Sequence, residues 1–138
     1  MCIRDSFFIV LQNPHTGRPT LVTASLDDKV ILEGVTRASI LQLAREQLNH
    51  EIEVEERKFT MREVADAVAE GRVVEAFAAG TAYFVAPISL IEWKGAELAI
   101  PMEEGHTGRF ARILGDWMRE VMYGAVEHEW ATVVEEVE

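Results

Sequence analysis

The stretch VVEAFAAGTAYFVAP, residues Val73–Pro87, has two strand-like flanks joined by the small residues AAGTA. Two apolar runs separated by a short segment that contains glycine are typical of paired antiparallel strands. Small side chains here would leave the backbone N–H groups of Thr81 and Ala82 unshielded, and two such groups can hold a carboxylate or phosphate oxygen. A tight turn or a bulge in a core strand explains the same residues, and the motif alone favours that simpler interpretation.

Apolar spacing around this stretch predicts an alternation of strands and helices. The expected strands are Phe7–Gln12 and Thr20–Ser25, joined as a hairpin, then Glu51–Phe59, and a pair around the Lys94-Gly95 turn between Ser89 and Ile100. The expected helices are Thr36–Asn49, a second that runs from the capping box Thr60-Met61-Arg62-Glu63 to Gly71, and a third with an apolar stripe from Phe110 to Val121 that ends at Gly124. This order predicts one domain of mixed α/β class.

Composition narrows the function classes. The 138 residues suit one domain, and 24 acidic against 13 basic residues give a formal charge of −11, which argues against a nucleic-acid surface. No apolar run is long enough to span a membrane. The single cysteine, Cys2, excludes an internal disulfide, and the four histidines are scattered without the spacing of a metal site. We therefore expect no metal, no nucleic-acid partner and no membrane partner.

The first six residues, MCIRDS, do not lead into the following strand with any cap, helix or targeting pattern. They resemble the translation of a transposon-end adapter used in library preparation. We expect residues 1–6 to be foreign, residues 7–138 to be natural sequence, and the natural protein to extend further upstream. An ordinary frayed chain end is the alternative.

A second anion-capable feature is Glu33-Gly34-Val35-Thr36-Arg37, where a glycine precedes an amphipathic helix. The first N–H groups of a helix have no partner within the helix, and their partial positive charge suits a phosphate. Gly34 would let a ligand approach the backbone, and Thr36 could add a hydroxyl donor. A simpler alternative is that Thr36 is the N-cap and Gly34 a turn residue.

Four segments resemble, in order and spacing, the C-terminal part of the branched-chain amino-acid aminotransferases. The segments are VILEGVTR (Val30–Arg37), ERKFTM (Glu56–Met61), EAFAAGTA (Glu75–Ala82), and MYG with HEW (Met122–Gly124 and His128–Trp130). These enzymes belong to the fold-type IV class, which uses pyridoxal phosphate, and the resemblance extends from Phe7 to the end of the chain. The helix motif LARE (Leu43–Glu46) and the turn EWKG (Glu92–Gly95) look most like fungal members.

The resemblance implies a fold, a site and a reaction. The chain would form the large C-terminal domain of the enzyme, a pseudo-barrel of strands flanked by helices. Gly34, Val35, Thr36 and Thr81 would hold the cofactor phosphate, and the N–H groups of Thr81 and Ala82 would receive the substrate carboxylate. The parent enzyme would move the amino group of leucine, isoleucine or valine to 2-oxoglutarate. It would be a homodimer in the cytoplasm or the mitochondrion.

One departure from the family decides what this chain can do alone. A transaminase needs a lysine that forms an imine with the cofactor aldehyde. The three lysines, Lys29, Lys58 and Lys94, do not match the family's lysine, which would lie upstream of Phe7. We therefore assign no catalytic residue within the chain and expect it to be inactive by itself.

Two alternatives stay open. The first is another fold-type IV enzyme, a D-amino-acid aminotransferase or an aminodeoxychorismate lyase, although the ending with Tyr123-Gly124 and Glu129-Trp130 argues against both. The second is a non-enzymatic module that only dimerises or binds small anions. A lysine encoded in frame upstream of Phe7, followed by Glu-x-Gly-Thr-Met-Asn, would support the enzyme.

Overall fold

The central element of the fold is β1 (Ser6–Gln12), which lies in the middle of a mixed sheet with the order β3-β2-β1-β4-β5. The computed structural model describes residues 6–27, 29, 31–103 and 106–134. β1 pairs in antiparallel fashion with β2 (Pro19–Thr23) and with β4 (Val73–Gly80). The other sheet strands are β3 (Glu53–Glu56) and β5 (Phe84–Pro87), and β6 (Leu90–Trp93) and β7 (Ala96–Ala99) form a separate hairpin.

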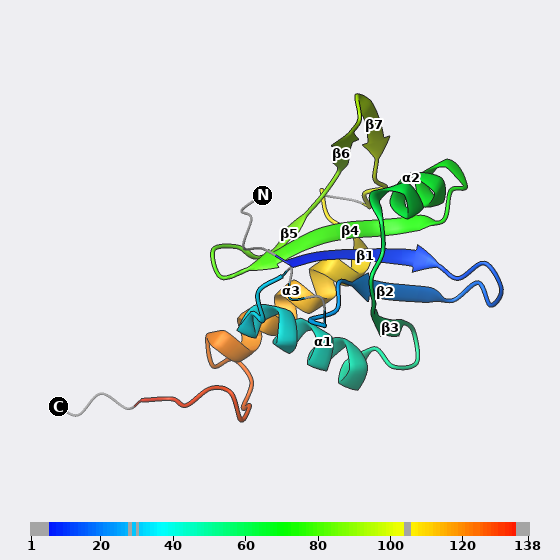
Figure 1. Cartoon of the computed structure of the whole chain (residues 1–138). Coiled ribbons are helices and arrows are strands. Elements are labelled where there is room, and N and C mark those ends of the chain that lie inside the picture. The colour runs from blue at the N-terminus through cyan, green and yellow to red at the C-terminus, as the bar shows by residue number, and fades with distance from the viewer. Residues whose placement is uncertain (1–5, 28, 30, 104–105, 135–138) are drawn as a thin grey trace.

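Helices and the hairpin cover the two faces of this sheet (Figure 1). One face packs against α1 (Val35–Gln47) and α3 (Arg109–Met122), and the opposite face packs against α2 (Met61–Ala69) and the β6–β7 hairpin. Strand alternation explains this division, because Phe8 and Val10 of β1 belong to the first core and Ile9 and Leu11 to the second. β1 is therefore apolar along nearly its whole length.

The expected hairpin, helices and strand pairs are confirmed, with shifted boundaries. β3 is shorter than the expected strand Glu51–Phe59, and it runs parallel to β2, with Thr20 opposite Glu53. Parallel neighbours need a crossover connection, which α1 provides here. Periodicity within a strand contains no information on the direction of its neighbour, so this pairing could not be read from the segment itself.

The mixed α/β class is confirmed, and within the described residues the strands form an open sheet, with β3 and β5 at its edges, rather than a closed barrel. Of the six residues expected to be foreign, residues 1–5 lie outside the described part of the chain. Ser6, also assigned to that segment, begins β1 and pairs with Ala79.

Candidate functional site

The main cavity lies where the start of α1 meets the turn between β4 and β5. It has a volume of ≈ 850 Å³, and α3 and the segment after it complete its wall. Its lining residues are Val35, Thr36, Ala38, Ser39, Gln42, Thr81, Phe84, Met118, Val121, Met122, Trp130, Ala131 and Thr132. The fold therefore brings Val35, Thr36 and Thr81, predicted from two separate motifs, to one cavity. Gly34 and Ala82 adjoin these residues in the chain but are not part of the described lining.

The start of α1 borders this cavity through Val35 and Thr36. Gly34 is the N-cap in an extended conformation, with φ −91° and ψ 139°, and no side chain caps the helix. The first turn contains no acidic residue that would oppose an anion. Thr36 is the second residue of the helix and is buried, so the alternative in which Thr36 is the N-cap is wrong. Because Gly34 has no side-chain oxygen, the initial N–H groups depend on another partner.

The turn between β4 and β5 contains Thr81, Ala82 and Tyr83. Gly80 pairs with Phe84, which has a φ of 58°, and the N–H of Val85 donates to the carbonyl of Tyr83. Within the described part of the chain, the turn hydrogen bonds include none donated by the N–H groups of Thr81 or Ala82. The segment is thus a tight turn, as the simpler interpretation predicted, and it also leaves two backbone donors unused. The sequence-based anion site and the turn are compatible.

The remainder of the cavity wall is mostly apolar, and its polar residues are Ser39, Gln42 and Thr132. Met118 and Val121 come from the last turns of α3, and Trp130 comes from the segment that follows the helix. Within this segment, the His128 ring contacts that of Trp130, with ring centroids 4.4 Å apart. The cavity thus combines residues of the two anion-capable motifs with a mostly apolar wall, which suits an anionic ligand with an apolar portion.

The lysines lie elsewhere in the fold. None of the three is among the described residues that line the cavity. Lys94 lies over the ring of Trp93 at 4.9 Å in the β6–β7 turn, and Lys58 follows β3. The chain therefore brings anion donors to the cavity without an amine that could react there. The described residues also contain no group of histidine, cysteine and carboxylate side chains arranged to hold a metal ion.

Sequence reasoning missed the buried carboxylate of Glu75 in β4. Its oxygens accept hydrogen bonds from the N–H groups of Phe110 at 3.0 Å and Ala111 at 2.6 Å, so Glu75 caps the start of α3. Burial raises the pKa of Glu75, and these two hydrogen bonds oppose the shift. A Cβ on Gly108 would lie 2.2 Å from an oxygen of Glu75, so this position needs glycine. An acidic residue inside an otherwise apolar strand was the signal available in the sequence.

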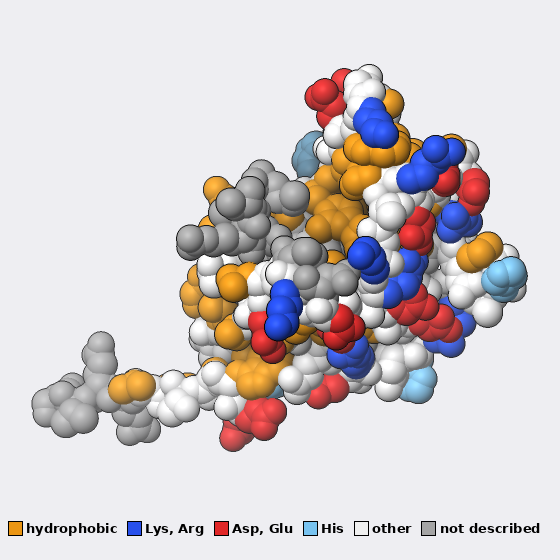
Figure 2. All heavy atoms as spheres, in the orientation of Figure 1, with side chains coloured by type: hydrophobic (Ala, Val, Ile, Leu, Met, Phe, Trp, Pro, Cys, Tyr) orange, Lys and Arg blue, Asp and Glu red, His pale blue; other side chains and the backbone are white. Residues whose placement is uncertain are grey.

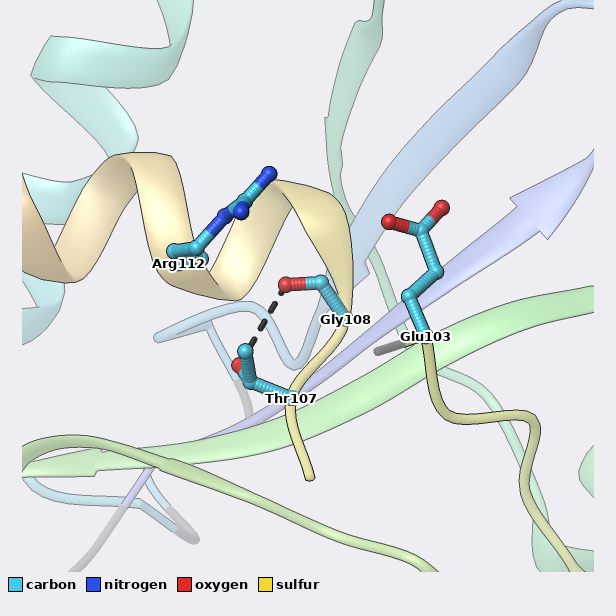
Figure 3. Close-up of a pocket in the computed structure, with 4 residues that line it drawn as sticks. All are labelled: Glu103, Thr107, Gly108 and Arg112. Atoms are coloured by element: carbon cyan, nitrogen blue, oxygen red, sulfur yellow. Dashed lines mark hydrogen bonds between the residues drawn. The ribbon is translucent and has the colours of Figure 1, made fainter. Parts of the chain in front are cut away.

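A smaller cavity of ≈ 330 Å³ adjoins this cap. Figure 3 shows Glu103 and Arg112 flanking the start of α3, with the Thr107 hydroxyl directed to the Gly108 carbonyl. A third cavity, of ≈ 610 Å³, lies at the base of the β6–β7 hairpin, where apolar side chains gather on the surface (Figure 2). Neither contains a residue predicted for the site. Among the described residues, no helix has the length and apolar character needed to cross a bilayer.

Comparison with known proteins assigns most of the chain to one family. The family described as amino-transferase class IV matches residues 8–91. The cytosolic branched-chain-amino-acid aminotransferase of Saccharomyces cerevisiae is 45% identical over 130 residues, which cover 92% of this chain and 34% of the relative. The mitochondrial enzyme of the same yeast is 40% identical over 130 residues, with coverages of 92% and 33%. The chain thus spans about a third of the length of these curated relatives.

Solved structures show the same likeness. The branched-chain amino acid aminotransferase of Thermobaculum terrenum, in its M4 mutant, has a TM-score of 0.62 and 31% identity, over 88% of this chain and 33% of that protein. The form of that enzyme with pyridoxal phosphate has a TM-score of 0.61 and 33% identity, with coverages of 87% and 32%. The fold described above therefore occurs in both structures as about a third of a larger chain.

Proposed function

Because the chain belongs to the class IV aminotransferase family, we propose that it forms the anion-binding part of a branched-chain amino-acid aminotransferase. The parent protein would transfer the amino group of leucine, isoleucine or valine to 2-oxoglutarate. The observation that carries this proposal is the convergence of Val35, Thr36 and Thr81 at one cavity. Relatives described as cytosolic and mitochondrial support a parent enzyme in one of these compartments, and we expect it to act as a homodimer.

The residues present fit a cofactor phosphate. The uncapped start of α1 offers N–H groups after Gly34, and no acidic side chain in its first turn competes with an anion. The hydroxyl-bearing residues Thr36 and Thr81 line the same cavity from two elements. Gly34, Val35, Thr36 and Thr81 would therefore hold the phosphate of pyridoxal 5′-phosphate.

The same turn would orient the substrate. The N–H groups of Thr81 and Ala82 would receive the carboxylate of the amino acid or of the 2-oxo acid, which fixes one end of the substrate relative to the phosphate. Bound pyridoxal phosphate supplies the electron sink for amino transfer. The residues of this chain contribute binding and orientation, and they offer no lysine at the cavity for proton transfer. We expect no turnover by the chain alone.

Phosphate recognition can be tested with a ligand that has no aldehyde and therefore cannot form imines with the lysines of the chain. The probe is pyridoxamine 5′-phosphate, which lacks a reactive aldehyde, and the matched ligand is pyridoxamine. We expect the purified chain to bind the phosphorylated probe in a fluorescence titration and to bind pyridoxamine at least tenfold more weakly, because the phosphate makes charge-assisted hydrogen bonds. Thr36→Val should weaken binding, whereas Thr16→Val in the exposed β1–β2 turn should not. Equal affinity for both ligands would overturn the assignment of the phosphate site.

The enzymatic assignment has its own test. Purified chain incubated with pyridoxal phosphate, leucine and 2-oxoglutarate should produce no glutamate. The gene upstream of the codon for Phe7 should encode, in frame, a lysine followed by Glu-x-Gly-Thr-Met-Asn. A start codon directly before Phe7 would instead favour a non-enzymatic module, and turnover by the chain would contradict the absence of a catalytic lysine.

A further inference from the structure

Arg37 lies beside the predicted phosphate residues but turns away from their cavity. It follows Thr36 in the first turn of α1, and its side chain is almost fully buried, with 4% exposed. Its Nη2 donates to the carbonyl of Ala24 at 2.8 Å and to Oε1 of Glu56 at 2.7 Å. A guanidinium so close in sequence to a phosphate site would be the obvious anion ligand, yet the structure uses it inside the protein.

Glu56 connects two positions along the helix. Its Oε1 accepts from Arg37, and its Oε2 accepts from Nη2 of Arg45 at 2.7 Å. We call Arg37, Arg45 and Glu56 the α1 clamp. The hydrogen bond from Arg45 contributes most to lowering the pKa of Glu56 below its ordinary value, and Arg37 lowers it further against the effect of burial. The carboxylate is therefore ionised at neutral pH and pairs with both arginines.

The α1 clamp attaches the helix to the sheet at one place. Glu56 is the last residue of β3 and lies opposite Thr23, the last residue of β2. The Ala24 carbonyl that Arg37 also binds follows Thr23 directly. Arg37 therefore joins its own helix to the ends of two neighbouring strands. Two contacts separated along a helix restrict both its rotation and its sliding, and so they restrict where its first N–H groups point.

We propose that the α1 clamp positions the start of α1 toward the cavity, with Arg37 and Glu56 as positioning residues rather than anion ligands. This inference rests on the proposed function. Turning Arg37 into the cavity would break its bonds to Ala24 and Glu56 and leave the partly exposed Glu56 carboxylate with one partner fewer. A bound phosphate is therefore held by backbone N–H groups and threonine hydroxyls, and its affinity depends on how firmly the clamp holds the helix.

The direction in which Glu56→Gln changes the affinity for phosphate distinguishes two roles of Arg37, that of an anion ligand and that of a positioning residue. If Arg37 bound the phosphate directly, removing the competing Glu56 charge would release the guanidinium and strengthen binding. If the clamp positions the helix, the same change weakens binding. Glu55→Gln is the matched control, because it removes one negative charge at the neighbouring position, where Glu55 pairs with Arg57 instead. Side chains at successive strand positions point to opposite sides, so the control leaves the clamp intact.

The experiment measures the dissociation constant of pyridoxamine 5′-phosphate for the wild-type chain and both variants. We expect Glu56→Gln to bind about five- to tenfold more weakly than Glu55→Gln, the effect of impairing roughly one charge-assisted hydrogen bond. Tighter binding by Glu56→Gln, or binding equal to that of Glu55→Gln, would overturn the proposal. If the wild-type chain does not bind the probe, the proposed function itself fails, which is a different result.

A second variant keeps the test valid if Glu56→Gln does not fold. Glu56→Asp retains the charge but shortens the side chain, so it strains the clamp without altering the net charge near the cavity. Weaker binding by Glu56→Asp than by Glu55→Asp would support positioning, because a purely electrostatic effect predicts equal affinities. Equal affinities would overturn the proposal. Circular dichroism of each variant shows that the comparison is made between folded proteins.

Discussion

At the scale of single residues, the buried side chain of Glu75 joins β4 to the start of α3. It is a carboxylate in the apolar strand β4, and it accepts hydrogen bonds from two N–H groups at the start of α3. Gly108 makes the close approach possible, because any larger residue would collide with the carboxylate. The negative charge meets the positive end of the helix dipole, which offsets part of the free energy needed to bury it.

A raised pKa makes the contribution of Glu75 depend on pH. Burial raises the pKa above the ordinary value of 4.5, so the folded state binds the proton more tightly than the unfolded state. The contribution to the free energy of unfolding is therefore greatest below pH 4.5 and declines as the pH rises through the folded-state pKa. The difference in free energy of unfolding between the wild-type chain and Glu75→Gln should decrease in that direction, as urea denaturation can measure.

The control for this titration is Glu97→Gln on the exposed part of β7. This change removes a carboxyl of the same type without touching the hydrogen bonds that cap α3. Glu103 and Arg109 also act on Glu75 and are retained in both proteins. A difference for Glu75→Gln that grows with pH would contradict the assigned direction.

At the scale of elements, local signals position α2 more completely than α1. The Thr60 hydroxyl accepts from the N–H of Glu63 at 3.2 Å, which confirms half of the expected capping box. The Glu63 carboxylate binds Arg57 at 2.6 Å. By contrast, α1 begins at a glycine without a side-chain cap, and its position depends on contacts with distant strands.

Removal of the side-chain cap of α2 should lower the stability of the chain. Thr60→Ala should lower the free energy of unfolding by about 1 kcal/mol, because the N–H of Glu63 loses its acceptor. Thr60→Ser keeps the hydroxyl and should remain near the wild-type value. Thr60 is exposed, so packing contributes little to the comparison. The interpretation would be wrong if serine and alanine destabilised the chain equally in urea denaturation.

At the scale of the whole molecule, two apolar cores share the sheet between them. The core toward α1 and α3 includes Phe8 and Phe77, whose stacked rings have centroids 5.0 Å apart on neighbouring strands. The core on the opposite face joins α2 and the β6–β7 hairpin to the same strands. The first core supports the cavity directly, because Met118 belongs to this core and also lines the cavity wall.

Removal of a central ring should therefore destabilise the entire fold. Phe77→Ala creates a cavity in a position without solvent exposure, and we expect the free energy of unfolding to fall by about 3–5 kcal/mol. Tyr83→Ala, on the exposed turn of the candidate site, should change it by less than about 0.5 kcal/mol. Guanidinium denaturation measures both values. Similar losses for the two variants would contradict the assignment of Phe77 to the supporting core.

Features that depend on neighbouring residues could be predicted from this sequence, whereas contacts between residues far apart in the chain could not. Local signals predicted elements that are present. They are the alternation of Phe8 and Ile9 in β1, the capping box that begins at Thr60, and Gly124 after the last helix. Neighbouring residues could not show that β3 runs parallel to β2. Nor could they exclude Thr36 as the N-cap of α1, because threonine is a preferred N-cap residue, whereas the structure has Gly34 in this position.

The sequence by itself determined the mixed α/β class, most of the helices and strands, and the two motifs that offer anion donors, since apolar periodicity, caps and turn residues act over a few positions. Only the tertiary structure decided that Val35, Thr36 and Thr81 meet at one cavity, that Arg37 turns to Glu56, and that Glu75 caps α3. These contacts join residues far apart in the chain, and they exist only after both faces of the sheet have been covered and the helices held against it.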